Sequence, residues 1–248
     1  MEFNKIYKQD CLIGMQQIPD KSIDMILCDL PYGMTGLKWD SVIPLDKLWE
    51  QYERIIKDNG VIALTASQPF TSKLGASNLK KLKYSLIWEK ENGTNFLNVK
   101  KMPFKVHEDI LIFYKGKSTY NPQMKEGTPY RRTHTIEQIV QGGKWARHSG
   151  LPVDFDTKNN GTRYPRSVLK FKTEKGLHPS QKPLALFEWL IKTYSNEGET
   201  ILDNCMGSGT TAIACINTNR NYIGFENDDK HFRTATERVA RHLENSSK

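Results

Sequence analysis

The last third of the chain contains the segment that most constrains the fold, residues 200–226. A short apolar strand leads into a glycine-rich turn, an Ala/Ile-rich helix follows, and a second strand ends in an acid. Glycines let a ligand approach the backbone closely, and the start of a helix offers N–H groups without a partner in the helix. Glu226 stands 23 residues after Asp203, close to the ~20 residues expected for an acid that binds ribose hydroxyl groups. The segment therefore predicts a nucleotide-binding strand–helix–strand unit.

The glycine turn leaves the class of nucleotide open. Its residues, Gly207-Ser208-Gly209-Thr210-Thr211-Ala212, fit the dinucleotide pattern GxGxxG only if alanine takes the third glycine position. Alanine is permitted there, so a dinucleotide site remains an alternative at this point.

A second buried strand, residues 22–28, ends at Asp29-Leu30-Pro31-Tyr32-Gly33. Ligands bind where parallel strands end at their carboxyl edge, so this loop is a natural place for chemistry. Pro31 fixes its own φ angle and restricts Leu30 to extended conformations, which stiffens the loop. A stiff loop can hold a carboxylate, backbone carbonyl groups and an aromatic ring around one planar group. The alternative is a strand end followed by an ordinary Pro-Gly turn.

An exocyclic amine on a nucleobase is a planar group that needs such a site. Its lone pair is delocalised into the ring, which makes the amine a poor nucleophile. The Asp29 carboxylate and the Leu30 carbonyl can accept hydrogen bonds from its two N–H groups and draw the nitrogen toward tetrahedral geometry. Tyr32 can stack on the base. Asp29, Leu30, Pro31 and Tyr32 are therefore the candidate catalytic residues.

Strands and helices alternate along the rest of the chain. We expect further strands at 5–7, 61–65, 82–88 and 110–114, helices at 12–18, 45–57 and 184–194, and a final helix capped by Asp228. Asp58-Asn59-Gly60 is expected to end the helix at 45–57. This order predicts an α/β fold with a doubly wound, mostly parallel sheet. With 248 residues, the chain is long enough for one large domain or two small ones.

The net charge of +8 comes from one quarter of the chain. Residues 115–177 hold 13 Lys/Arg against 5 Asp/Glu, and the remainder is balanced, with 23 of each. Aromatic residues interleave with this basic excess, which favours a polyanionic partner over a merely solvated basic surface. We expect this region to bind a polyanion such as a nucleic acid; a disordered basic insertion is the alternative. The candidate DNA-binding residues are Arg131, Arg132, Lys144, Arg147, Arg163 and Arg166.

Cysteine usage and hydropathy limit the remaining classes. Cys11, Cys28, Cys205 and Cys215 are scattered, and no pair has metal-ligand spacing, so we expect reduced thiols, a cytoplasmic protein and no metal. No apolar run approaches the ~20 residues of a membrane span. The first residues lack the apolar core of a signal peptide. We therefore expect no membrane partner.

Three motifs resemble those of the DNA amino-methyltransferases. Asp29-Leu30-Pro31-Tyr32 is similar to their Asp-Pro-Pro-Tyr motif, with Leu30 replacing the first proline but keeping its carbonyl oxygen. Residues 203–211 resemble Asp-Pro-Phe-x-Gly-Ser-Gly-Thr-Thr, with Asn204 and Cys205 in place of proline and phenylalanine. Residues 178–183 resemble His-Pro-Thr-Gln-Lys-Pro, with a serine that keeps the hydroxyl group of the threonine.

The order of these motifs resembles the β group of the family, because the catalytic motif precedes the cofactor motif and the basic region lies between them. The resemblance implies a Rossmann-like class I methyltransferase fold that is circularly permuted. It implies a catalytic part at 1–114, an inserted target-recognition region at 115–177, and a cofactor-binding part at 178–248 of the same domain as the first. It also implies a homodimer.

The resemblance implies S-adenosylmethionine as the cofactor. The residues that it assigns to this cofactor are Asp10, Cys11, Asp29, His178, Ser180, Gln181, Lys182, Asp203, Cys205, Gly207, Ser208, Gly209, Thr210, Glu226 and Asn227. From position alone, Asp10 is also expected to cap a helix.

An aspartate at position 29 favours the N6 amine of a flipped adenine in double-stranded DNA as the methyl acceptor. The cytosine N4 members of the family more often have serine there, and N4-cytosine methylation is the alternative within the class. A protein amide methyltransferase with a related Asn-Pro-Pro-Tyr motif is a second alternative, against which the basic region counts. A DNA-binding protein with a degenerate site is a third, against which the intact Asp29, Tyr32, Gly207, Gly209 and Glu226 count.

Overall fold

The computed structural model describes residues 1–37, 40–134, 155–174, 176 and 181–246. The chain divides into two compact units. The larger contains Met1–Asn121 and Ser167–Lys248, and the smaller contains Pro122–Arg166. The smaller unit falls within the predicted target-recognition region.

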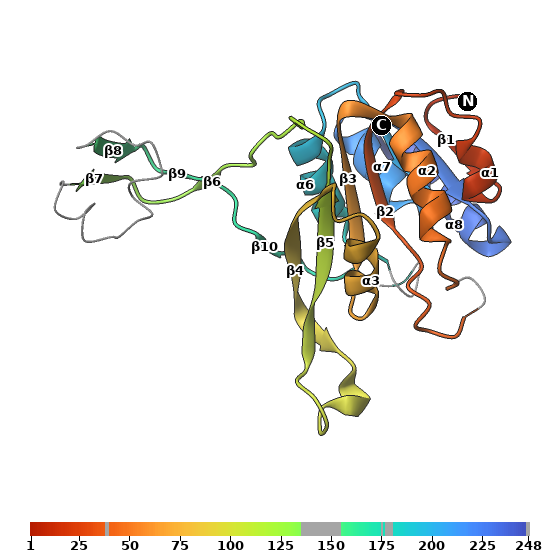
Figure 1. The fold of residues 1–248 in the computed structure, drawn as a ribbon, viewed down its shortest axis with the longest axis horizontal. Helices are drawn as coiled ribbons and strands as arrows, with labels where there is room; N and C mark the ends of the chain where they lie inside the picture. Colours follow the sequence, from red (N-terminus) through yellow and green to blue (C-terminus); the bar gives the residue numbers. More distant parts are fainter. Residues whose placement is uncertain (38–39, 135–154, 175, 177–180, 247–248) are drawn as a thin grey trace. The chain divides into compact units, whose positions relative to one another are not determined.

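The larger unit is built on an eight-stranded sheet with the strand order β1-β12-β11-β2-β3-β5-β4-β10 (Figure 1). The strands are β1 (Lys5–Lys8), β2 (Ile23–Asp29), β3 (Ile56–Ala66), β4 (Leu82–Thr94), β5 (Lys105–Phe113), β10 (Val168–Lys170), β11 (Thr200–Asp203) and β12 (Asn221–Glu226). Neighbouring strands pair in parallel except β5, which is antiparallel to β3 and β4. β4 and β5 are joined by a short connection containing the 3-10 helix η1 (Phe96–Asn98), whereas a parallel crossover needs about a dozen residues or more.

Helices cover both faces of this sheet (Figure 1). One face carries α1 (Cys11–Met15), α2 (Leu45–Ile55) and α3 (Phe70–Ser77), and the other carries α6 (Leu184–Tyr194), α7 (Thr210–Asn217) and α8 (Asp229–Ser246). Successive residues of β2 alternate between the two cores, with Ile26 and Cys28 toward α2 and Met25 and Leu27 toward α6. Burial on both faces explains why the strand is a continuous apolar run. The predicted doubly wound, mostly parallel sheet is confirmed.

One predicted boundary is wrong. α2 ends at Ile55 and β3 begins at Ile56, so Asp58-Asn59-Gly60 belongs to the strand and does not end the helix. Ile56 pairs with Ile23, and a register shift follows. Gly60 permits this irregularity, because a Cβ atom there would lie 2.8 Å from the Asp24 carbonyl oxygen. Ile55 and Ile56 both pack in the core, and these contacts outweigh the local turn signal of Asp58-Asn59-Gly60.

The smaller unit contains two short antiparallel ribbons. One pairs β6 (Lys125–Glu126) with β9 (Thr162–Arg163), and the other pairs β7 (Tyr130–His134) with β8 (Phe155–Asn159). The guanidinium carbon of Arg163 lies 4.8 Å from the centroid of the Tyr130 ring, within the range of a cation–π contact. The side chains of Arg131, Arg132 and Arg166 are exposed.

The expectations about membrane spans, circular permutation and domain division have different outcomes. Among the helices in the described ranges, none is both long and apolar enough to cross a membrane. The circular permutation stays a prediction, as does the division into catalytic, target-recognition and cofactor-binding parts.

Candidate active site

Parallel strands bring the predicted site residues to one edge of the sheet. Asp29 ends β2, Asp203 ends β11 and Glu226 ends β12, and these strands are neighbours. Because the carboxyl ends of parallel strands meet at one edge, all three residues border a single pocket. Its volume of about 420 Å³ lies within the range of small-molecule sites.

The pocket gathers most of the residues that the motifs singled out. Those that line it are Asp10, Cys11, Asp29, Leu30, Pro31, Tyr32, Gln181, Lys182, Asp203, Cys205, Gly207, Ser208, Thr210, Glu226 and Asn227. Gly209 belongs to the same turn, between two lining residues. His178, Ser180, Lys144 and Arg147 lie outside the described residues. Described residues from three motifs that are far apart in the sequence therefore meet around one cavity.

The Asp29 carboxylate is held from three directions. Its Oδ1 atom accepts hydrogen bonds from the hydroxyl groups of Tyr32, at 2.8 Å, and Thr65. Its Oδ2 atom accepts one from the Lys182 ammonium group at 2.6 Å. A carboxylate offers about four acceptor positions, so these contacts leave one position on Oδ2 for a ligand. Sequence reasoning missed Thr65, whose signal is its register opposite Asp29 on the neighbouring strand.

The loop after Tyr32 is closed by the carboxylate of Asp40. It accepts hydrogen bonds from the three backbone N–H groups of residues 33–35, at 2.7 to 2.8 Å. Burial alone would raise the pKa of Asp40, but the Thr35 hydroxyl and these N–H groups lower it below its ordinary value. The Tyr32 ring stacks on Phe70, with centroids 5.3 Å apart. These contacts hold the loop in place beside the pocket, and the role of Asp40 was not predicted.

Asp203 organises the glycine turn that follows β11. Its carboxylate accepts hydrogen bonds from the Cys205 backbone N–H, at 3.0 Å, and from the Thr211 hydroxyl group. Burial raises the pKa of Asp203 to about 6, although these two donors act to lower it. Gly209 has a φ angle of +81°, and a Cβ atom there would lie 3.2 Å from Ala235 Cα in α8. Conformation and space both require glycine at this position.

Arg238 of α8 supports the same turn. Its Nη1 atom donates hydrogen bonds to the Ser208 carbonyl oxygen at 3.1 Å and to the Thr210 hydroxyl group at 3.0 Å. No motif in the sequence marks this arginine, because only the packing of α8 against the turn brings it there. Sequence reasoning therefore missed it.

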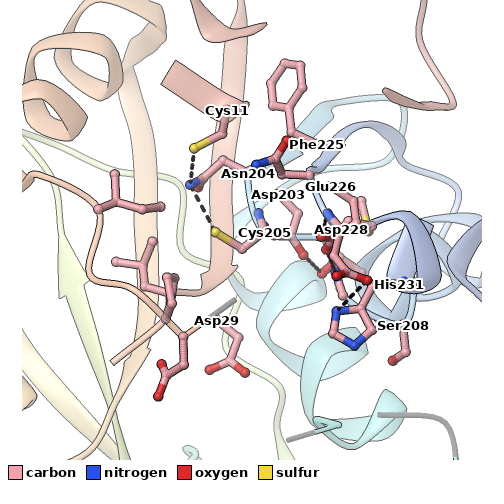
Figure 2. Close-up of a pocket in the computed structure, with 18 of the residues that line it drawn as sticks. Cys11, Asp29, Asp203, Asn204, Cys205, Ser208, Phe225, Glu226, Asp228 and His231 are labelled. Carbon is pink, nitrogen blue, oxygen red and sulfur yellow. Dashed lines mark hydrogen bonds and ion pairs between the residues drawn. The ribbon is translucent and has the colours of Figure 1, made fainter. Parts of the chain in front are cut away.

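Glu226 lies where an acid that binds ribose hydroxyl groups is expected. It accepts hydrogen bonds from the backbone N–H groups of Gly207, at 2.8 Å, and Asp228, at 2.9 Å. Burial raises the pKa of Glu226 above its ordinary value, against these donors. Asp228 caps α8, as predicted, by accepting from the N–H groups of Lys230 and His231. Figure 2 shows Glu226, Asp228 and His231 gathered on one side of the pocket.

Asp10, Cys11, Asn204 and Cys205 also line the pocket. Asp10 caps α1 by accepting from the Leu12 N–H at 2.8 Å, which confirms the role predicted from its position. The Asn204 amide nitrogen lies 3.7 Å from Cys11 Sγ and 3.5 Å from Cys205 Sγ (Figure 2). The contact with Cys205 and burial raise the pKa of the Cys11 thiol. These cysteines are free thiols.

The arrangement combines two chemically different halves. Asp29 and its loop offer acceptors and an aromatic ring for a planar amine, and the glycine turn with Glu226 offers a site for a nucleoside. In the described part of the chain, no group of three or more His, Cys, Asp or Glu side chains is arranged to hold a metal ion. The pocket is therefore suited to placing a nucleoside-containing cofactor beside a base.

The chain is similar to known DNA methyltransferases in sequence and in fold. A model of the DNA methylase family (N6_N4_Mtase) matches residues 23–237. The type II methyltransferase M1.MboII of Moraxella bovis is 25% identical over 241 residues, covering 90% of this chain and 92% of the relative. The DNA adenine methyltransferase YhdJ of Escherichia coli (strain K12) is 27% identical over 262 residues, covering 96% and 83%. The crystal structure of an M1.HpyAVI–SAM complex matches with a TM-score of 0.65 at 25% identity, covering 95% of this chain and 98% of that chain.

The matched range includes both the Asp29 loop and the segment from Asp203 to Glu226. The likeness to the solved structure extends over nearly the whole chain and shows the Rossmann-like class I methyltransferase fold. The family that the sequence predicted is therefore confirmed. This chain belongs to the DNA methylase family, the N6 and N4 amino-methyltransferases.

Proposed function

We propose that this protein transfers the methyl group of S-adenosylmethionine to the N6 amine of a flipped adenine in double-stranded DNA. The observation that carries the proposal is the shared pocket, which the Asp29 loop and the Asp203–Glu226 segment border together. An amine held by Asp29 would lie next to a cofactor held by the glycine turn. Direct transfer requires this proximity.

The residues around the glycine turn fit S-adenosylmethionine. Glu226 lines the pocket at the end of β12, where it can accept hydrogen bonds from ribose hydroxyl groups. Asp10 and Asp203 add acidic groups to a pocket that would receive a cationic cofactor. The similar protein M1.HpyAVI was crystallised with SAM. When bound, the sulfonium supplies a methyl group that is already activated for displacement.

Asp29 and the Leu30 carbonyl are proposed to accept hydrogen bonds from the two N–H groups of the target amine. Because the Asp29 Oδ1 atom is held by two hydroxyl groups, the amine meets the remaining position on Oδ2. The nitrogen becomes positively charged as its bond to the methyl carbon forms and the carbon–sulfur bond breaks. A preorganised carboxylate stabilises this charge, and the amine then loses a proton.

Adenine is the proposed target because of the aspartate at position 29. Cytosine N4 members of the family more often have serine there, and the relative YhdJ is named a DNA adenine methyltransferase. The target base has to leave the duplex to reach a pocket, and Tyr32 is proposed to stack on it. N4-cytosine transfer would use the same residues.

The smaller unit is proposed to contact DNA within the target-recognition region, 115–177. The residues proposed for this contact are Arg131, Arg132, Lys144, Arg147, Arg163 and Arg166. Arginine and lysine side chains bind phosphates, and arginine can also read base edges. A homodimer is proposed from the family resemblance, and a cytoplasmic location is proposed from the scattered, free cysteines.

The test is transfer of a labelled methyl group from S-adenosylmethionine to genomic DNA, followed by nucleoside analysis. We expect label in N6-methyladenine. Label in N4-methylcytosine would keep the mechanism and replace the target base. A protein that binds the cofactor but labels no unmethylated DNA from several sources would overturn the proposal and direct attention to protein or RNA substrates.

A further inference from the structure

Four charged side chains form an unbroken row that ends at Asp29. Lys182 Nζ lies 2.6 Å from Asp29 Oδ2 and 3.3 Å from Glu108 Oε2. Lys90 Nζ contacts the other oxygen of Glu108. The side chains of Lys182 and Glu108 are 5% and 15% exposed. The sign of the charge alternates along the row, so Lys182 and Glu108 each have an opposite charge on both sides.

The β4–β5 pairing holds the outer half of this row. Glu108 on β5 pairs with Trp88 on β4, and Lys90 follows two residues later on the same face of β4. Lys90 Nζ also lies 4.6 Å from the centroid of the Trp88 ring. Glu108 is therefore fixed by the sheet, whereas Lys182 precedes α6 in a connecting segment. Lys182 thus lies between two carboxylates that the sheet holds, Asp29 at the end of β2 and Glu108 on β5.

Burial alone would lower the pKa of Lys182, but the carboxylates of Asp29 and Glu108 raise it above its ordinary value. Burial would raise the pKa of Glu108, but Lys182 and Lys90 hold it below its ordinary value. Asp29 and Glu108 thus favour the charged form of Lys182, and Lys182 and Lys90 favour the charged form of Glu108. With Glu108 present, the four charges of the row sum to zero, and without it the row would carry one net positive charge.

We propose that Glu108, which belongs to none of the sequence motifs, is a positioning residue that acts on Asp29 through Lys182. The inference rests on the proposed function and deepens it. Glu108 holds Lys182, and Lys182 holds Asp29 Oδ2 so that its one remaining acceptor position meets the target amine. Glu108 also offsets one of the two ammonium charges, so that the row carries no net positive charge to oppose the amine as it becomes cationic. Misplacement by about 1 Å at a reacting group can cost ~100-fold in rate.

The first test is the Glu108→Gln variant, which keeps the shape of the side chain and removes its charge. We expect kcat with saturating DNA to fall by about 10- to 100-fold. The KM for DNA and the equilibrium Kd for S-adenosylhomocysteine, the product that the cofactor leaves, are expected to change less than about twofold, because Glu108 does not line the pocket. A crystal structure of the variant is expected to show Lys182 Nζ displaced from Asp29.

A double-mutant cycle tests whether Glu108 acts through Lys182. We expect Lys182→Met to lower kcat, and we expect the addition of Glu108→Gln to change it by less than about twofold more. If Glu108→Gln does not fold, Glu108→Asp replaces it, since this variant keeps the charge and withdraws it from Lys182. Its kcat is expected to fall with an unchanged Kd for S-adenosylhomocysteine.

Asp24→Asn is the matched control. Asp24 is a buried carboxylate near the other end of β2, and it pairs with Lys57 at 2.6 Å. The variant is expected to lose stability but to keep the kcat of the wild-type protein per mole of folded enzyme. Three outcomes would overturn this inference but not the proposed function. They are an unchanged kcat in the Glu108 variant, a Kd for S-adenosylhomocysteine that rises as much as kcat falls, and a loss of kcat that adds fully to the loss in Lys182→Met. A wild-type protein that methylates no DNA would overturn the proposed function, and this inference with it.

Discussion

The pocket and the smaller unit use charge in opposite ways. In the pocket, Asp29 and Lys182 are largely buried and fixed by a contact of 2.6 Å. In the smaller unit, Arg131, Arg132 and Arg166 are exposed. Exposed charges contribute little individually and are screened by salt, but their number sets the affinity for a polyanion. Buried, paired charges hold atoms in position. We infer that methyl transfer depends on fixed geometry, whereas the attraction of DNA depends on how many cations are present.

The largest expected effect is that of Asp29→Ala. Removing the carboxylate takes away the acceptor that orients the amine and stabilises its charge, so we expect methyl transfer to fall by about 10³-fold or more. The Kd for the cofactor, measured by equilibrium binding, is expected to change only a few-fold because the glycine turn is intact. Loss of cofactor affinity comparable to the loss of activity would remove the role assigned to Asp29.

Asp203 is expected to make the free energy of unfolding of the protein depend on pH. Burial raises its pKa from 3.8 to about 6, so the folded protein binds this proton more tightly than the unfolded chain does. The stability of the wild-type protein, relative to Asp203→Asn, is therefore expected to fall as pH rises from about 4 to about 6 and to stay constant above that, by about 3 kcal/mol in total. Urea unfolding of both proteins across this range measures the difference. A difference that grows above pH 7 would contradict the assignment.

Glu226→Gln tests the nucleoside half of the pocket. A hydrogen bond to a charged group contributes about 1.5–3 kcal/mol, so we expect the Kd for S-adenosylmethionine to rise about 10- to 100-fold. With saturating cofactor, kcat is expected to change much less. Glu237→Gln, an exposed change on α8, is the control and is expected to leave the Kd unchanged. A normal Kd in Glu226→Gln would separate this residue from the cofactor.

The smallest expected effect is that of Arg131→Gln with Arg132→Gln in the smaller unit. If each arginine contacts one phosphate, the slope of log K for DNA against log salt concentration falls by about 2, and the affinity at moderate salt falls several-fold. Filter binding at several salt concentrations measures both. Arg241→Gln, on an exposed part of α8, is the control. A drop in kcat at saturating DNA would instead link these arginines to the chemistry and break the contrast with the pocket.

Elements with a strong local pattern were predicted to the residue. The helix expected at 184–194 is observed as α6, and the strand–helix–strand unit expected within residues 200–226 is observed as β11, α7 and β12. Their apolar runs and the turn residues around them depend only on near neighbours in the chain. The end of α2 was predicted wrongly because two isoleucines of the core decide it. The antiparallel course of β5 is a property of strand pairing, which no local pattern encodes.

The family, the two ends of the site and the residues proposed for chemistry can be inferred from the sequence alone, because motifs such as Asp29–Tyr32 and Asp203–Thr211 are contiguous. Which residues support these motifs depends on the fold. Thr65 reaches Asp29 through strand register, Arg238 reaches the glycine turn through the packing of α8, and Glu108 reaches Lys182 from β5. The physical reason is that contacts between distant segments depend on how strands pair and helices pack, and these supporting residues carry no pattern of their own.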